Sequence, residues 1–152
     1  MEDIYVLPRE EIKKRKEEKV KLESELRTIE EKLSKIEEGS LSYKNGTYDK
    51  LLARTNYLKS QLEYYTWRAL SEEEFREWYM KENEWLWNQL KSRGEEPVCD
   101  MCSKKIERPE EIRSLGGIDY HPEHFKIYAL NQLKHKDVID ERAEFLLRSL
   151  KI

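Results

Sequence analysis

Two segments in the N-terminal half repeat apolar residues at alternating intervals of three and four positions. The first repeat comprises Leu22, Leu26, Ile29, Leu33 and Ile36, and the second comprises Leu51, Thr55, Leu58, Leu62 and Tyr65. This spacing places one apolar stripe along a helix and is typical of helices that pair in coiled coils. The turn-forming residues Gly39, Ser40, Asn45 and Gly46 separate the two repeats. Residues 1–70 are therefore predicted to form an antiparallel helical (coiled-coil) hairpin.

The first helix is predicted to begin at Pro8, because proline suits a first turn and the helix dipole favours the acidic residues that follow. Arg15 and Lys19 occupy early positions of the apolar repeat. The second helix is predicted to begin near Thr47. A parallel homodimer of the first helix alone is an alternative, but it would leave the second repeat without a partner helix.

Residues 71–96 are predicted to contain an aromatic-rich helix. Ser71 is followed by glutamate three residues later, which is the pattern of a capping box, and the helical pattern continues to about Ser92. Its large side chains lie on more than one face: Phe75, Tyr79, Leu86 and Leu90 form a stripe, Trp78 and Trp85 lie beside it, and Met80 and Trp87 point elsewhere. More than one face must then be covered. Packing within the chain is one explanation, and a partner surface that includes Trp78, Trp85 and Trp87 is the other.

Segment 97–135 is predicted to be a zinc-binding finger with its helix. Within it, residues 99–125 hold both cysteines of the chain, Cys99 and Cys102, and two of its three histidines, His121 and His124. A separation of two residues lets a tight turn direct both thiols at one ion. Pro122 is expected to start a helix, which places the two histidines on one side of its first turn. Two thiolates and two imidazoles suit tetrahedral Zn(II) and leave no coordination position open. The sequence thus predicts one structural zinc ion.

The segment between the two ligand pairs is predicted to form a small β-hairpin, because Gly116 and Gly117 precede an alternating pattern around Ile118. A tight cysteine turn, a hairpin and a helix N-terminus together form a treble-clef-like finger. Such a short segment has few apolar groups, so metal binding must contribute to its folding. A redox pair formed by Cys99 and Cys102, or two histidines unrelated to the cysteines, are the alternatives.

The same segment resembles half of a LIM domain. Cys99, Cys102 and His121 match three ligands of that family's first zinc module, and Phe125 matches the aromatic residue after the fourth. His124 stands where the family mostly has cysteine, and no cysteine follows that could form the second zinc module. The resemblance covers residues 99–125 and implies docking onto another protein. A hairpin joined to a zinc finger also resembles the layout of bacterial regulators of RNA polymerase, although its tip lacks their acidic signature.

Two helices are expected after the ligands, one from Pro122 to about Lys134 and one from Asp137 to Leu150 in segment 136–152. The fold class is therefore mainly α: a helical hairpin and further helices with a small treble-clef-like finger. Charged residues make up 40% of the chain and apolar residues 38%, a balance that fits long, solvated helices.

Several classes of function are disfavoured by composition. No apolar run is long enough to cross a bilayer, and the acidic N-terminus lacks a signal-peptide core, so a cytoplasmic location is expected. The net charge of −3 gives no global basis for binding nucleic acid. Once zinc has its four ligands, only His135 would titrate near neutral pH, and no glycine-rich phosphate loop is present, so an enzyme is not expected.

The sequence therefore predicts a non-enzymatic, zinc-stabilised adaptor that acts through protein contacts, with regulation of transcription as a candidate setting and a homodimer as an open alternative. The other functional candidate is a DNA- or RNA-binding regulator. It would use Lys104, Lys105 and Arg108 near the finger, or segment 44–68, where basic residues and tyrosines are interleaved.

Overall fold

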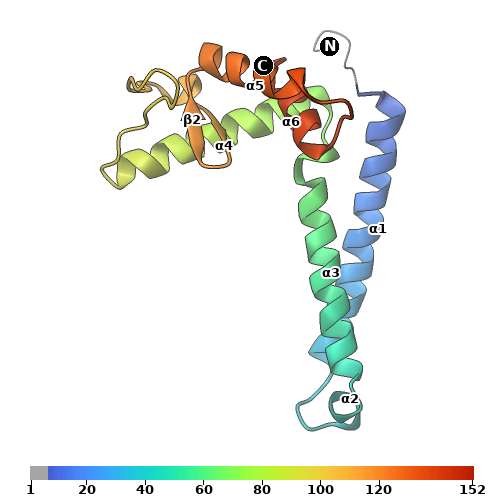
Figure 1. Cartoon of the computed structure of the whole chain (residues 1–152). Helices are drawn as coiled ribbons and strands as arrows, with labels where there is room; N and C mark the ends of the chain where they lie inside the picture. Colours follow the sequence, from blue (N-terminus) through green and yellow to red (C-terminus); the bar gives the residue numbers. More distant parts are fainter. Residues whose placement is uncertain (1–6) are drawn as a thin grey trace. The chain divides into compact units, whose positions relative to one another are not determined.

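A computed structural model describes residues 7–152, so residues 1–6 of the predicted hairpin lie outside the described part of the chain (Figure 1). The described residues are mainly helical, as predicted. They divide into two compact units, which we call the hairpin unit (residues 7–71) and the finger unit (residues 72–152). The predicted segments 71–96, 97–135 and 136–152 fall almost entirely within the second unit. Over residues 7–152, no helix combines the length and apolarity that a membrane span requires.

In the hairpin unit, α1 (Arg9–Ser34) and α3 (Thr47–Arg68) pack side by side (Figure 1). Their core contains the buried residues Leu22, Ile29 and Leu58, with Leu26, Leu33, Leu51, Leu62 and Tyr65 packed around them. The core thus consists of residues from the two predicted repeats. The connection between the helices contains a short helix that was not predicted, α2 (Leu41–Lys44), which begins where the Ser40 hydroxyl accepts a hydrogen bond from the Tyr43 backbone.

Two long-range polar contacts define the direction of these helices. Arg15 donates to the Arg68 carbonyl oxygen over 3.0 Å, and Arg54 donates to Glu25 over 2.8 Å. The earlier residue of α1, Arg15, contacts the end of α3, and the later residue, Glu25, contacts a point nearer the start of α3. The two helices are therefore antiparallel.

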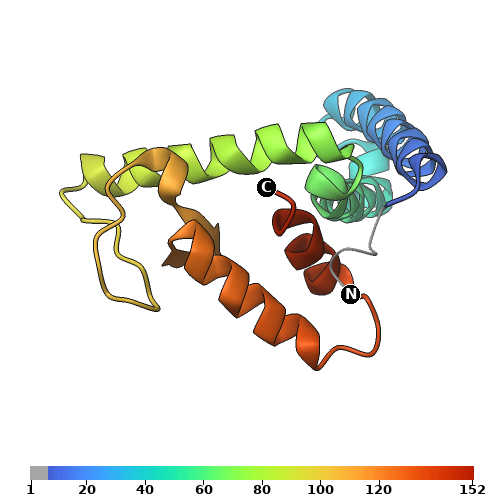
Figure 2. The same cartoon turned by 90° about the horizontal axis from the view of Figure 1, so that it is seen from above.

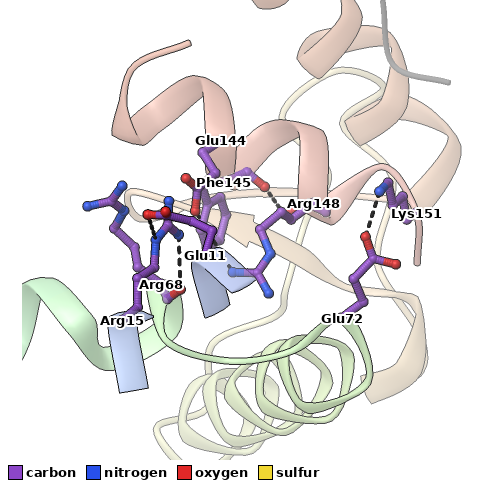
Figure 3. A network of polar contacts seen from close by, with 9 residues as sticks. Glu11, Arg15, Arg68, Glu72, Glu144, Phe145, Arg148 and Lys151 are labelled. Carbon is purple, nitrogen blue, oxygen red and sulfur yellow. Dashed lines mark hydrogen bonds and ion pairs between the residues drawn. The ribbon is translucent and has the colours of Figure 1, made fainter. Parts of the chain in front are cut away.

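Arg15 occupies a position of the apolar repeat. Although its side chain is charged, only 8% of the residue is exposed. Its guanidinium binds the last-turn carbonyl of α3 and the Glu11 carboxylate, 3.2 Å away (Figure 3). A helix leaves its last carbonyl groups without intrahelical partners, and its dipole favours a cation at that end. Arg15 can therefore lie between the two helices, since its guanidinium supplies a donor to a carbonyl group in the last turn of α3.

The finger unit begins with α4 (Glu72–Ser92) and ends with α5 (Pro122–Lys134) and α6 (Glu141–Ser149). Between α4 and α5 lie a 3₁₀ turn, η1 (Pro109–Glu111), and two short antiparallel strands, β1 (Arg113–Leu115) and β2 (Ile118–Tyr120). Gly116 and Gly117 both have positive φ, at 60° and 84°, which is the conformation that a two-residue hairpin turn requires. The predicted β-hairpin is confirmed.

One apolar core connects the parts of this unit. Its buried residues are Cys99, Ile106, Ile112, Tyr120, Phe125, Ala129, Leu133, Ala143, Leu146 and Leu147. α6 contacts both α4 and α5 (Figure 2). At the two ends of the unit, Lys151 binds Glu72 over 2.7 Å (Figure 3), and the Arg148 guanidinium lies 4.6 Å from the ring centre of Phe75. The cysteine segment is thus part of a shared core.

The last helix begins later than predicted. Val138 and Ile139, which lie within the predicted range of Asp137 to Leu150, precede the helix and are 74% and 47% exposed. Asp140 has extended backbone geometry, and its carboxylate accepts a hydrogen bond from the Ala143 backbone over 2.8 Å, so it caps α6. Capping by aspartate fixed the start of the helix four residues after Asp137.

Replacing Asp140 with alanine should lower the midpoint of thermal unfolding, because the first turn of α6 loses its cap; serine at the same position should retain most of it. A hydrogen bond from Lys136, and then one from Ala143, lowers the pKa of Asp140. A carboxyl group with a lowered pKa stabilises the fold above its unfolded-state pKa and loses this effect as pH falls through the folded-state value. The difference between wild type and D140A in calorimetry should therefore shrink in acid. Equal midpoints for both variants at neutral pH would contradict this role.

Candidate metal centre

The two cysteines lie in a narrow turn, residues 97–106, which we call the knuckle. The Cys99 backbone donates to the Lys104 carbonyl over 2.9 Å, and that of Ile106 donates to the Pro97 carbonyl over 2.8 Å. Ser103 has a φ of 61°, a left-handed conformation, and its N–H donates to the Cys99 carbonyl. This tight reversal is what allows two thiols separated by two residues to converge.

The two histidines are positioned by the start of α5. His121 is the residue before the helix, Pro122 is its first residue and His124 lies in its first turn, as predicted. A hydrogen bond of 2.8 Å from the Asp100 backbone to the Asp119 carbonyl joins the knuckle to β2, the strand that leads into His121. The ligand pairs are therefore brought together by backbone contacts as well as by their own side chains.

The four side chains surround a common point. Cys99 Sγ lies 3.3 Å from His124 Nδ1, and Cys102 Sγ lies 3.4 Å from His121 Nδ1. The ligand atoms of all four residues lie within 4.8 Å of one another. Zinc bonds of ordinary length at tetrahedral angles would separate sulfur from nitrogen by about 3.5 Å. The donor set and its spacing fit one metal ion.

A second hydrogen bond orients the His121 ring. Its Nε2 atom lies 3.1 Å from the Lys105 carbonyl oxygen, which can only accept, so Nε2 carries the proton and Nδ1 faces the cysteines. Histidine ligands of metals commonly have such an outer partner, which fixes the ring and its tautomer.

The lowered pKa of Cys99 favours metal binding, whereas the raised pKa of His121 means that a metal ion must displace a proton from that ring. Burial raises the pKa of the Cys99 thiol, but hydrogen bonds from the backbone of His121, Cys102 and Met101 and from the His124 ring outweigh it and lower the pKa to about 6. Burial likewise lowers the pKa of His121, while its contacts with Cys99 and Lys105 outweigh this and raise it. A thiolate, which is the form that binds metals, is thereby favoured at Cys99 near neutral pH.

The centre has a buried side and an open side. Cys99 is fully buried in the core of the finger unit, whereas Cys102, His121 and His124 are partly exposed. The open side forms a depression that is also lined by Ser103, Lys104, Lys105, Glu107 and Glu123. A metal ion can therefore reach the ligands from solvent. His135, the third histidine, is exposed after the end of α5 and is not part of this cluster.

The other residues predicted as partner contacts occupy different environments. Trp85 is 61% exposed, and Lys104, Lys105 and Arg108 are also exposed. Trp78 is half-buried between Phe75 and Phe145. Trp87 packs against the core of the finger unit, and its indole donates to the Ile106 carbonyl over 3.1 Å.

The contacts of α4 with the rest of the finger unit were not predicted from the sequence. Tyr79 donates to the Ser114 carbonyl over 3.0 Å, and the buried Asn83 side chain accepts from the Ser114 backbone over 3.1 Å. Together with Trp87, these residues follow one another at intervals of four along one face of α4. That interval was the available signal, but it was obscured because Asn83 is polar and interrupts the aromatic stripe.

No protein-family model matches the chain, and neither the curated proteins nor the solved structures include one with significant similarity.

Proposed function

We propose that the chain is a non-enzymatic, zinc-stabilised adaptor that acts through protein contacts, with regulation of transcription as a candidate setting. The observation that carries the proposal is the convergence of two cysteine sulfurs and two histidine nitrogens at separations of 3.3 and 3.4 Å. This set fills the tetrahedral sphere of zinc and leaves no position for a substrate, which is the arrangement of structural sites. We assign the finger to the treble-clef type, with a first module similar to that of LIM domains.

Zinc would stabilise the knuckle in particular. Within residues 97–106 the buried side chains are Pro97, Cys99 and Ile106, too few to order ten residues by apolar burial alone. Structural zinc contributes folding free energy directly in small domains of this kind. With two thiolates and two neutral imidazoles, the loaded site carries no net charge.

The metal assignment is tested by mass-spectrometric metal analysis of purified protein and by titration with Co(II). One zinc ion per chain and a tetrahedral Co(II) spectrum with sulfur-to-metal charge-transfer bands are expected. A strong chelator should remove the ion and expose the backbone amides of residues 97–125 to hydrogen exchange. Protein that binds neither metal would refute the assignment.

The adaptor role is supported by exposed groups that the fold does not use. Trp85 projects from α4 with 61% of its surface exposed, and a large exposed aromatic side chain is typical of interaction sites. We also propose that α1 and α3 pack as a coiled coil and that the chain works in the cytoplasm, where thiols stay reduced. Affinity capture from host lysate with and without nuclease tests the role. The Trp85→Ala protein should no longer capture the specific partners that wild type retains after nuclease treatment. The adaptor role is contradicted if Trp85→Ala captures the same partners as wild type, or if nuclease abolishes capture by wild type.

A second candidate function, nucleic-acid binding, is supported by the composition of one face of α3. The Arg54 guanidinium lies 5.0 Å from the ring centre of Tyr57, and that of Arg68 lies 4.3 Å from Tyr64. Tyr57 is 51% exposed, and such rings can stack on bases beside a cation. Binding to a single-stranded oligonucleotide that weakens steeply with salt, and that is lost in Tyr57→Ala with Tyr64→Ala, would favour this candidate over the adaptor.

A further inference from the structure

Two consecutive carbonyl groups of the knuckle have partners on different elements. The Lys105 carbonyl accepts from Nε2 of the metal ligand His121 over 3.1 Å, and the Ile106 carbonyl accepts from the Trp87 indole over 3.1 Å. Successive residues of an extended segment point their carbonyls in opposite directions. Residues 104–106, which we call the return segment of the knuckle, therefore lie between a metal ligand on one side and α4 on the other.

The hydrogen bond between the Trp87 indole and the Ile106 carbonyl lies at the apolar core of the finger unit. Ile106 is 1% exposed, and the Trp87 ring packs against the same cluster that contains Cys99. A buried carbonyl that loses its donor keeps the full cost of leaving water, so this bond favours the folded position of the knuckle strongly. The backbone of the knuckle in turn determines where the cysteine sulfurs lie, because the Cys99 N–H is hydrogen-bonded to the Lys104 carbonyl across the turn.

We propose that Trp87 is a positioning residue of the metal centre: its indole N–H holds the return segment of the knuckle so that Cys99 and Cys102 face His121 and His124 before the ion binds. This inference rests on the metal site proposed above. Trp87 acts on the ligands through the backbone of residues 104–106.

The role has a measurable consequence for affinity. If the metal-free knuckle exchanges between a docked and an undocked form, the apparent dissociation constant for zinc is the intrinsic one divided by the docked fraction. Trp87 raises that fraction. Because coupling is reciprocal, zinc in turn strengthens the bond between Trp87 and Ile106.

Trp87→Phe retains a ring and removes the donor, and it should weaken zinc binding about tenfold, the size expected for an unsatisfied buried carbonyl. Zinc competition titration against a chromophoric chelator measures this. Two matched controls lie on the same helix. Tyr79→Phe removes one hydrogen bond from α4 to a different carbonyl, that of Ser114, and Trp78→Phe removes the same indole bulk. Both should change thermal stability and leave zinc affinity within about twofold.

Two results would overturn the inference. One is a W87F protein that binds zinc as tightly as wild type does, and the other is a control variant that weakens zinc binding as much as W87F does. If wild type binds zinc and only this comparison fails, the metal site stands and the role of Trp87 is refuted. Absence of zinc binding in wild type refutes both.

A measurement on the wild-type protein serves if W87F does not fold. The exchange of the Trp87 indole proton with solvent, followed by NMR, should slow when zinc is added to the metal-free protein. Equal exchange rates in the two forms would show that the indole does not sense the metal and would refute the proposal.

Discussion

Replacing Cys99 with serine should abolish stoichiometric zinc binding and unfold the knuckle. A serine hydroxyl does not replace a thiolate as a zinc ligand, and a three-ligand site loses the closed sphere of a structural centre. Structural zinc contributes on the order of 10 kcal/mol to small fingers at neutral pH, which is comparable with the whole stability of a typical domain. Because Cys99 belongs to the core of the finger unit, cooperative melting of that unit should also broaden and shift to lower temperature.

Metal analysis and circular dichroism with thermal melting check this expectation. Met101→Ser is the matched control, because it places the same serine in the same turn at a residue that is 43% exposed. It should retain one zinc ion and a nearly unchanged melting curve. A Cys99→Ser protein that purifies with one zinc ion, or that melts like the control, would contradict the proposed centre.

Replacing Leu58 with alanine should destabilise the hairpin unit by about 3 kcal/mol, since a fully buried leucine is truncated in a well-packed site. Leu58 is completely buried against Leu22 and Ile29, and these three form the buried apolar core between α1 and α3. A two-helix core of this size has little reserve, so the loss is a large fraction of its stability. Urea unfolding followed by helical circular dichroism measures the change.

Leu52→Ala provides the comparison on the same helix, with a residue that is 39% exposed. Its effect should stay within about 0.5 kcal/mol, because alanine favours the helix and little apolar contact is lost. Similar losses for the two variants would mean that α1 and α3 do not pack through the predicted seam.

Features determined by local patterns could be predicted from the sequence. The repeats around Leu22 and Leu58 identified the residues that pack between α1 and α3, because helical periodicity depends only on spacing. Pro122 identified the start of α5 and placed the two histidines on one side of it. Ligand type and spacing then sufficed to identify the four residues that converge.

Features determined by partners distant in the sequence could not be predicted. Arg15 interrupts an apolar repeat, and its burial makes sense only through a carbonyl group 53 residues away. The buried Asn83 accepts a hydrogen bond on its amide oxygen from the Ser114 backbone, and the Trp87 indole donates one to the Ile106 carbonyl. Sequence periodicity treats each of these residues as a surface group or a partner contact, since it contains no information on which backbone groups will lack donors.

The hydrogen bond between Asp100 and Asp119 also bears on how such a chain can diverge. It joins the knuckle directly to β2, so the positions of the ligand pairs do not depend on the path of the chain between them. Residues 107–110 lie in that path and are mostly exposed. Insertions and deletions there should be tolerated during evolution, as they are in surface loops generally. Homologues of this chain are therefore expected to keep the paired ligands while the eighteen-residue interval between Cys102 and His121 varies in length.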